Sequence, residues 1–246
     1  MNTPPDPQSL GHNALDRVLE TGIETFLEAV ETLEVKLDGN LLQLLQGQVN
    51  SLALHGEELV AGEGFSLEAI ALKTDNIAIN WFKVLLGKLE LTHPTTATLR
   101  LVIGEGDLNR AIQSDWWRNW LREQALTVAG ESLSLCWQTG EIRLPDRDRL
   151  FIEAQLLVCR DSGTRPVAFA ITLQLIDGEF RFEQGHYEPD RAFTLDETVA
   201  LLTLASRWLN QRQFQGQGLS ITCDRLAIEP QQLILWLQTT IQELSL

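Results

Sequence analysis

The chain has 246 residues, of which 44% are hydrophobic and 22% are charged, and this composition predicts a folded protein with a sizeable core. Its formal net charge at pH 7 is -15, and the first 75 residues hold thirteen acidic side chains against three basic ones. These charges exclude nucleic acid as the expected partner, because binding it needs a basic face.

The chain begins with a proline-rich stretch, so residues 1–13 are predicted to form a disordered tail ahead of a single domain over residues 14–246. This tail lacks the cationic start and the apolar run of a secretory signal. No later segment reaches the roughly 18 apolar residues of a membrane span. We therefore expect a cytoplasmic protein, with peripheral attachment to a membrane as the second option.

A helix followed by a meander of strands is predicted for the first third. Asn13 is suited to cap the start of the helix, and apolar side chains from Leu15 to Val30 lie along one face of that helix. Alternating runs predict strands over residues 33–37, 49–54, 65–72 and 77–81. Between the first two of these strands, residues 41–45 are predicted to form one helical turn.

The stretch from Thr98 to Leu121 changes its hydrophobic period from two to 3.6 without a break. Leu99, Leu101 and Ile103 alternate as on a half-buried strand, so a strand is predicted to run directly into an amphipathic helix. One face of that helix carries Leu108, Ala111, Ile112, Trp116 and Trp120. Trp117 points away from Leu108, so we expect it outside the core, in contact with a membrane interface or a partner.

The second half returns to period two. Alternating runs over residues 133–137, 142–144, 150–158, 167–175 and 180–182 predict a long antiparallel sheet. A second amphipathic helix is predicted to begin at the capping box formed by Thr194 and Glu197. The last strands are expected over residues 219–228, with a bulge at Asp224, and over residues 233–237.

These elements predict an α+β fold in which a long curved antiparallel sheet is wrapped around amphipathic helices. The inner sheet face and the helix stripes are both apolar, so the space between them is either a filled core or an apolar groove. Composition by itself favours the filled core.

No residue pattern predicts catalysis, a cofactor or a bound metal. The four histidines belong to no metal-ligand motif, and the three cysteines lack C-x-x-C spacing and are expected to be reduced thiols. Asp146, Asp148 and Asp161 are explained by solvated ion pairs with nearby arginines. A hydrolase that uses these acidic turns is the least favoured functional option. Asp107 is expected to interact with free N–H groups at the start of its helix.

Three segments resemble successive blocks of the LmeA-like phospholipid-binding family, which is found in cyanobacteria and actinobacteria. They are Leu-Leu-Gln-Leu-Leu-Gln-Gly-Gln-Val at residues 41–49, Trp-Phe-Lys-Val-Leu-Leu-Gly at 81–87, and the strand and helix start at 99–112. Gly47 and Gly87 occupy the two turn positions of these blocks. In the third block of the family, a strand leads into a helix that begins with Asp-Leu-Asn, and Asp107, Leu108 and Asn109 occupy these positions here.

The resemblance implies a fold similar to one half of the tubular lipid-binding proteins, in which a curved sheet rolled around helices holds acyl chains. It also implies binding of phospholipid or another amphiphile without catalysis, in lipid carriage or membrane-lipid homeostasis. We expect the groove to be lined by Leu108, Ile112, Trp116, Trp120, Leu195, Val199 and Leu202. The alternative is a protein–protein interaction module that uses its apolar helix faces and its acidic first third.

Overall fold

The structure is a computed structural model that describes residues 28–39, 43, 48–61, 65–78, 91–124, 126–128, 130–216 and 218–241. The expected disordered tail over residues 1–13, nearly all of the first helix and the helical turn at 41–45 (Gln43 apart) lie outside the described residues. Gly47 and the block at residues 81–87 also lie outside them.

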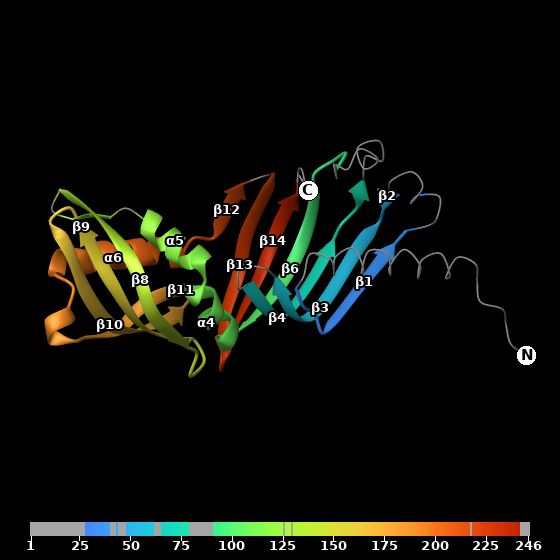
Figure 1. Cartoon of the computed structure of the whole chain (residues 1–246). Coiled ribbons are helices and arrows are strands. Elements are labelled where there is room, and N and C mark those ends of the chain that lie inside the picture. Colours follow the sequence, from blue (N-terminus) through green and yellow to red (C-terminus); the bar gives the residue numbers. More distant parts are fainter. Residues whose placement is uncertain are drawn as a thin grey trace, which may run out of the picture.

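The larger sheet has seven antiparallel strands in the order β1-β3-β4-β6-β14-β13-β12 (Figure 1). Its strands are β1 (Thr32–Asp38), β3 (Ser51–Ala61), β4 (Phe65–Thr74), β6 (Thr95–Gly104), β12 (Gln213–Gly216), β13 (Leu219–Glu229) and β14 (Gln232–Ile241). A two-stranded sheet pairs β2 (Gln48–Val49) with β5 (Ile77–Ala78). The expected bulge is confirmed, because the register of β13 against β14 shifts between Cys223 and Arg225.

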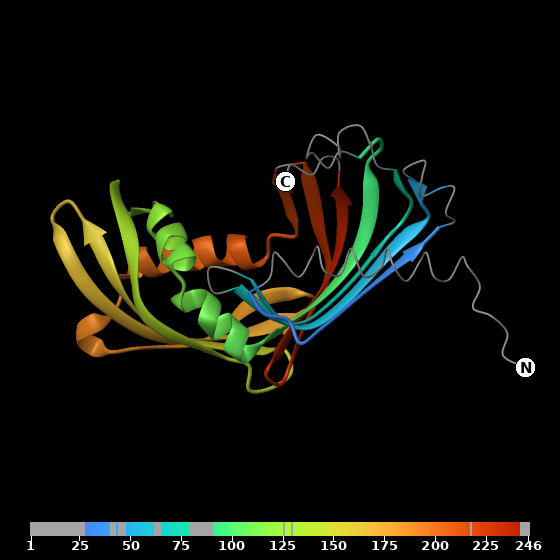
Figure 2. The ribbon, with the colours of Figure 1, turned by 45° about the vertical axis from the view of Figure 1, so that its right-hand side comes forward.

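The second sheet has five antiparallel strands in the order β11-β10-β9-β8-β7. They are β7 (Leu126–Val128), β8 (Glu131–Arg143), β9 (Arg149–Arg160), β10 (Gly163–Ile176) and β11 (Glu179–Tyr187). The expected single long sheet is therefore wrong for the described strands, which form two main sheets, both curled (Figure 2). The reason is that both edges of β6 are already paired, with β4 and with β14, so the β-ladder does not continue from β6 to β7.

Three α-helices accompany the sheets within the described part of the chain: α4 (Glu105–Gln113), α5 (Asp115–Glu123) and α6 (Leu195–Leu209). A short 3-10 helix, η2 (Pro189–Arg191), precedes α6. Strands make up most of the residues that the structure describes. The expected continuous helix after β6 is also wrong, because Ser114 has extended backbone angles and ends α4. Its Oγ accepts a hydrogen bond from the Trp117 N–H at 3.2 Å and so begins α5.

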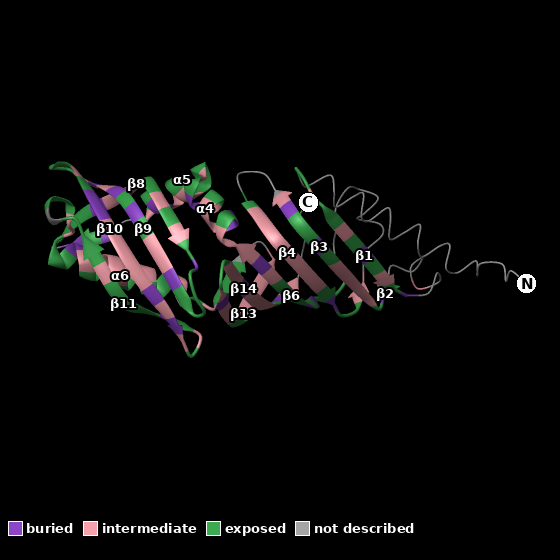
Figure 3. Cartoon of the chain, turned by 90° about the horizontal axis from the view of Figure 1, so that it is seen from below, coloured by how far each residue is buried: buried purple, intermediate pink, exposed green. Residues whose placement is uncertain are grey.

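The five-stranded sheet carries most of the buried hydrophobic side chains, whereas the seven-stranded sheet is mostly half-buried (Figure 3). A first core joins that smaller sheet to α4, α5 and α6, and its buried members include Ile112, Leu121, Leu135, Leu156 and Val167. A second core lies where the two sheets meet, and it combines Leu144, Leu150, Leu173, Leu175, Phe180 and Ile228. Ile228 belongs to the seven-stranded sheet, so this second core holds the two sheets together.

Candidate functional site

One face of the seven-stranded sheet is apolar across six of its strands. On the central strand β6 this face is formed by Leu99, Leu101 and Ile103, and the cross-strand register continues it in both directions. We call this set the apolar sheet face, and its other members are Leu33, Val35 and Leu37 on β1, Leu52 and Leu54 on β3, Ile70 and Leu72 on β4, Leu226 and Ile228 on β13, and Leu233, Leu235 and Leu237 on β14.

The side chains of the apolar sheet face are incompletely buried. Only Val35 and Ile228 among them are buried, and the others are half-buried. Among the matching inward positions of the five-stranded sheet, Leu135, Val158 and Val167 are at most 2% exposed and Leu133 and Leu156 at most 4%. A protein core normally packs as densely as an organic crystal, so this half-buried face is the unusual feature of the molecule.

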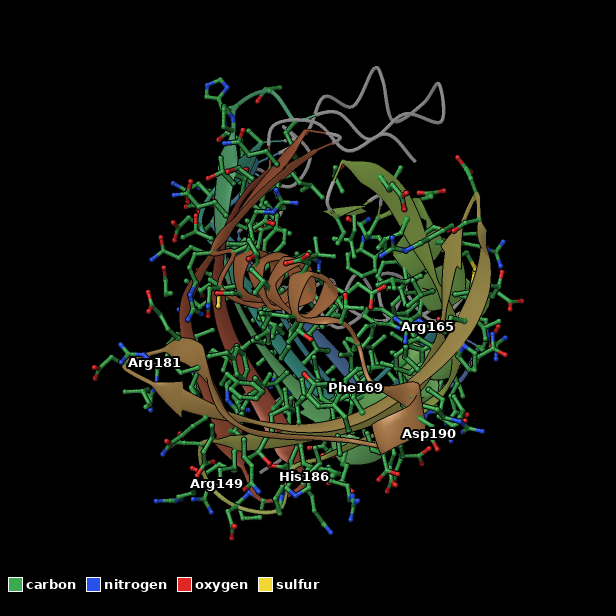
Figure 4. All side chains as sticks on the ribbon, turned by 90° about the vertical axis from the view of Figure 1, so that its left-hand side faces the viewer. Arg149, Arg165, Phe169, Arg181, His186 and Asp190 are labelled. Carbon is green, nitrogen blue, oxygen red and sulfur yellow. The ribbon has the colours of Figure 1, made fainter. Side chains whose placement is uncertain are left out.

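The apolar sheet face lies on the same side of its sheet as the helices. Leu226 and Leu233 from this face pack in the second core together with Leu108 of α4 and Leu209 of α6. An end-on view shows α6 between the strands of the two sheets (Figure 4). The opposite face is mixed: Val102 and Ile234 are buried there, and the guanidinium carbons of Arg100 and Arg225 lie 5.8 and 4.6 Å from the ring centroid of Trp236.

The first turn of α6 is held by a buried carboxylate. Glu197 is 3% exposed and accepts hydrogen bonds from Arg160 Nη2 at 2.9 Å, from Arg165 and from the Thr194 N–H at 2.8 Å. Thr194 in turn accepts from the Glu197 N–H, so the predicted capping box is confirmed. Burial alone would raise the pKa of Glu197, but the hydrogen bonds from Thr194, Arg165 and Arg160 outweigh it and lower that pKa.

Helix α6 carries apolar side chains on two sides. Ala200, Leu201 and Leu204 pack against the first core. On another side Leu195 is 79% exposed and Val199 is 57% exposed, and Leu202 follows them at helical spacing. Val199 and Leu202 line a surface hollow of about 520 Å³. We call these three residues the α6 stripe, and they are three of the seven expected groove residues.

Two other expected groove residues lie in the cores. Ile112 is 6% exposed inside the first core, and Leu108 packs against the second. Both residues belong to α4 and pack this helix against the sheets. That either residue contacts a lipid stays a prediction.

The tryptophans of α5 form a cluster with aromatic side chains from three other elements. Trp120 lies 5.0 Å from Trp117 and 5.1 Å from Trp208 of α6, measured between ring centroids. Trp116 is 41% exposed and meets Phe65 of β4 at 5.3 Å. Trp116 and Trp120, the last two expected groove residues, line a surface hollow of about 750 Å³ on α4 and α5.

Trp117 packs toward the core, against expectation. Its ring meets the Trp137 ring at 5.7 Å, it packs against the first core, and its Nε1 is buried without a hydrogen-bond partner. The expected geometry assumed one helical phase from Leu108 to Trp120, and the break at Ser114 changes that phase. Contact of Trp117 with a membrane stays a prediction, but Trp116 is the more accessible of the two indoles.

The Asp107 and Asn109 side chains fasten α4 to both sheets. Asp107 accepts hydrogen bonds from the Gly104 N–H at 2.9 Å, as expected at a helix start, and from Ser66 Oγ of β4 at 2.7 Å. Asn109 pairs with the backbone of Ile142 on β8: its Nδ2 donates to the carbonyl and its Oδ1 accepts from the N–H, both at 2.8 Å. These two side chains therefore have a structural role.

The described residues contain no group of three or more His, Cys, Asp or Glu side chains placed to hold a metal ion. Within the same residues, no helix has both the length and the apolar character needed to cross a membrane. Asp146 lies in a turn with its carboxylate 3.9 Å from Arg149, an exposed ion pair of the ordinary kind.

Comparisons with curated proteins and with solved structures each find no match. A comparison with protein families matches the chain over residues 7–238 to the family described as LmeA-like phospholipid-binding. That range covers nearly the whole chain, and it includes the three blocks on which the resemblance was based. The chain therefore belongs to the LmeA-like phospholipid-binding family.

Proposed function

We propose that this protein binds phospholipid without catalysis and shelters acyl chains between the apolar sheet face and the α6 stripe. The observation that carries the proposal is the incomplete burial of an apolar face that spans six strands. Membership of a phospholipid-binding family supports lipid as the ligand. The protein would act at a membrane surface, as a carrier or in membrane-lipid homeostasis.

The chemistry of the two surfaces suits hydrocarbon. Each methylene that leaves water contributes about 0.8 kcal/mol, so ten sheltered methylenes contribute about 8 kcal/mol before ordering costs. The side chains of the apolar sheet face are Leu, Ile and Val. They carry no polar group, so contact with an acyl chain leaves no side-chain hydrogen-bond donor or acceptor without a partner. No cofactor is required for such binding.

The first test measures lipid that accompanies the purified protein, by native mass spectrometry and by extraction followed by lipid mass spectrometry. We expect bound phospholipid, and uptake of labelled phospholipid from vesicles by protein stripped of lipid. A preparation that neither carries nor takes up any amphiphile would overturn the proposal. The interaction-module alternative predicts that negative outcome.

The second test places charge on the α6 stripe, because Leu195 and Val199 are exposed and their replacement removes no core packing. The double variant Leu195→Glu, Val199→Glu should lower lipid uptake at least tenfold, since a carboxylate does not tolerate contact with hydrocarbon. Its melting temperature should stay within about 2 °C of the parent value, as for most surface substitutions.

The control variant is Gln155→Glu, which adds a negative charge at an exposed position of β9. It should leave both uptake and melting temperature unchanged. Undiminished uptake by the double variant, with the control also normal, would remove α6 from the proposed binding surface. Conversion of a labelled lipid by the parent protein would contradict its non-catalytic character.

A further inference from the structure

Two of the three cysteines lie against each other on neighbouring strands of the five-stranded sheet. Cys136 belongs to β8 and Cys159 to β9, and their Sγ atoms are 3.4 Å apart. In the register, Cys136 stands opposite Leu157 and Cys159 opposite Ser134, so the two thiols are diagonal neighbours on one face. The third cysteine, Cys223, belongs to β13 of the other sheet.

The pair lies on the face of the five-stranded sheet that does not carry the first core. The inward positions of β8 are Leu133, Leu135 and Trp137, and Cys136 alternates with them. Both cysteines are half-buried free thiols. A small reagent therefore has access to them from outside the core.

We propose that Cys136 and Cys159 form a cross-strand dithiol that a small disulfide oxidant, such as oxidised glutathione, converts into a disulfide linking β8 to β9. A thiolate of the pair attacks one sulfur of the oxidant, and the S–S bond of the oxidant breaks to release one reduced thiol. The second cysteine then attacks the mixed disulfide, the Cys136–Cys159 bond forms, and the other thiol of the oxidant leaves. Two electrons and two protons pass from the protein to the oxidant.

Closure requires little movement. A disulfide bond is about 2.05 Å long, so each Sγ must approach its partner by less than about 1 Å. Burial raises the pKa of the Cys159 thiol, and its hydrogen bond with Cys136 raises it further. The Cys159 thiol is therefore protonated at neutral pH, and it reacts through its thiolate fraction when an oxidant is supplied.

The test equilibrates the full chain in glutathione buffers of increasing oxidised fraction, quenches with acid, and counts free thiols by alkylation in denaturant and intact mass. We expect three free thiols under reducing conditions and one under oxidising conditions, with the protein two hydrogens lighter. A peptide digest without reductant should contain Cys136 joined to Cys159. The melting temperature of the oxidised form should rise by about 5 °C.

The variants separate this pair from the third thiol. Cys223→Ser should still form the bond, whereas Cys136→Ser and Cys159→Ser should not. Mass spectrometry needs no functional readout, so the result does not depend on lipid binding. Three free thiols at every buffer composition, a lasting glutathione adduct in place of the internal bond, or a linkage through Cys223 would overturn the proposal.

Discussion

The Trp137 indole and Gly140 fit together on the inner side of β8. A Cβ atom added to Gly140 would lie 2.4 Å from Cζ2 of Trp137 and 2.9 Å from the carbonyl oxygen of Glu153. The indole could move only into the packed first core, and the carbonyl is part of the β-ladder between β8 and β9. At this position a hydrogen atom is therefore the largest substituent that fits.

The variant Gly140→Ala should lower the free energy of unfolding by about 2 kcal/mol, because overpacking forces side chains off their rotamers or shifts the backbone. Urea unfolding followed by tryptophan fluorescence measures the change. Gly106→Ala is the control, since Gly106 lies exposed in α4 and its nearest neighbour is Arg110 Nη1 at 3.7 Å. That control should be neutral or slightly stabilising. Equal stability of the two variants would contradict this account of Gly140.

At the scale of elements, helix α6 depends on Glu197. Its pKa is lowered in the folded protein, so the unfolded chain binds a proton more readily than the folded one as the pH falls. The stabilisation is complete above the ordinary glutamate value of about 4.3 and is lost as the pH falls through the lowered folded-state value. Stability from this residue is therefore present at neutral pH and absent in strong acid.

Replacing Glu197 by Gln should cost about 2 kcal/mol of unfolding free energy at neutral pH, because Arg160 and Arg165 lose the carboxylate they share. The difference from the parent protein should begin to shrink as the pH falls below the ordinary glutamate value of about 4.3, where the unfolded chain takes up a proton, and it should vanish once the folded-state carboxylate, with its lowered pKa, is protonated as well. Urea unfolding across this pH range measures it. Glu188→Gln, which removes an exposed ion pair 3.6 Å from Arg191, should change little at any pH. A pH-independent cost at Glu197 would refute the linkage.

Local patterns in the sequence predicted the elements better than their packing. The capping box at Thr194, the bulge beyond Cys223 and the strands from β8 to β11 follow from alternation and cap chemistry, which act between near neighbours. The break at Ser114 was missed because serine is tolerated inside helices and only its hydrogen bond to the Trp117 N–H makes it a cap here. The two-way pairing of Asn109 with Ile142 leaves no signal in a single sequence.

The candidate site was predictable only in part, for a related reason. Periodicity tells which side chains share a face, but it does not tell what covers that face. It therefore grouped Leu195 and Val199, which are exposed, with Ile112, which is buried in the first core. The leucines of β6 and β14 were predicted to lie on the inner face of half-buried strands, but the incomplete burial of these inward side chains became visible only once the two sheets were placed.

At the scale of the whole molecule, Trp116 is one of the exposed aromatic side chains available to the membrane surface that the proposed function requires. Trp116→Ala should weaken cosedimentation with phospholipid vesicles severalfold and leave the melting temperature nearly unchanged, because the ring is 41% exposed. Trp117→Ala should instead lower the melting temperature, since that ring packs on Trp137. The reverse pattern would return the membrane contact to Trp117.

The order of strands in the larger sheet has a consequence for biosynthesis. The central strand β6 takes β14 as one of its neighbours, with Gly104 opposite Gln232, and the whole five-stranded sheet is encoded between them. A ribosome that adds roughly 5–20 residues per second needs about 6–25 s to make that interval. During this time the nascent β6 has one unpaired edge beside Leu99, Leu101 and Ile103, and that edge stays a template for aggregation until translation delivers the last strands.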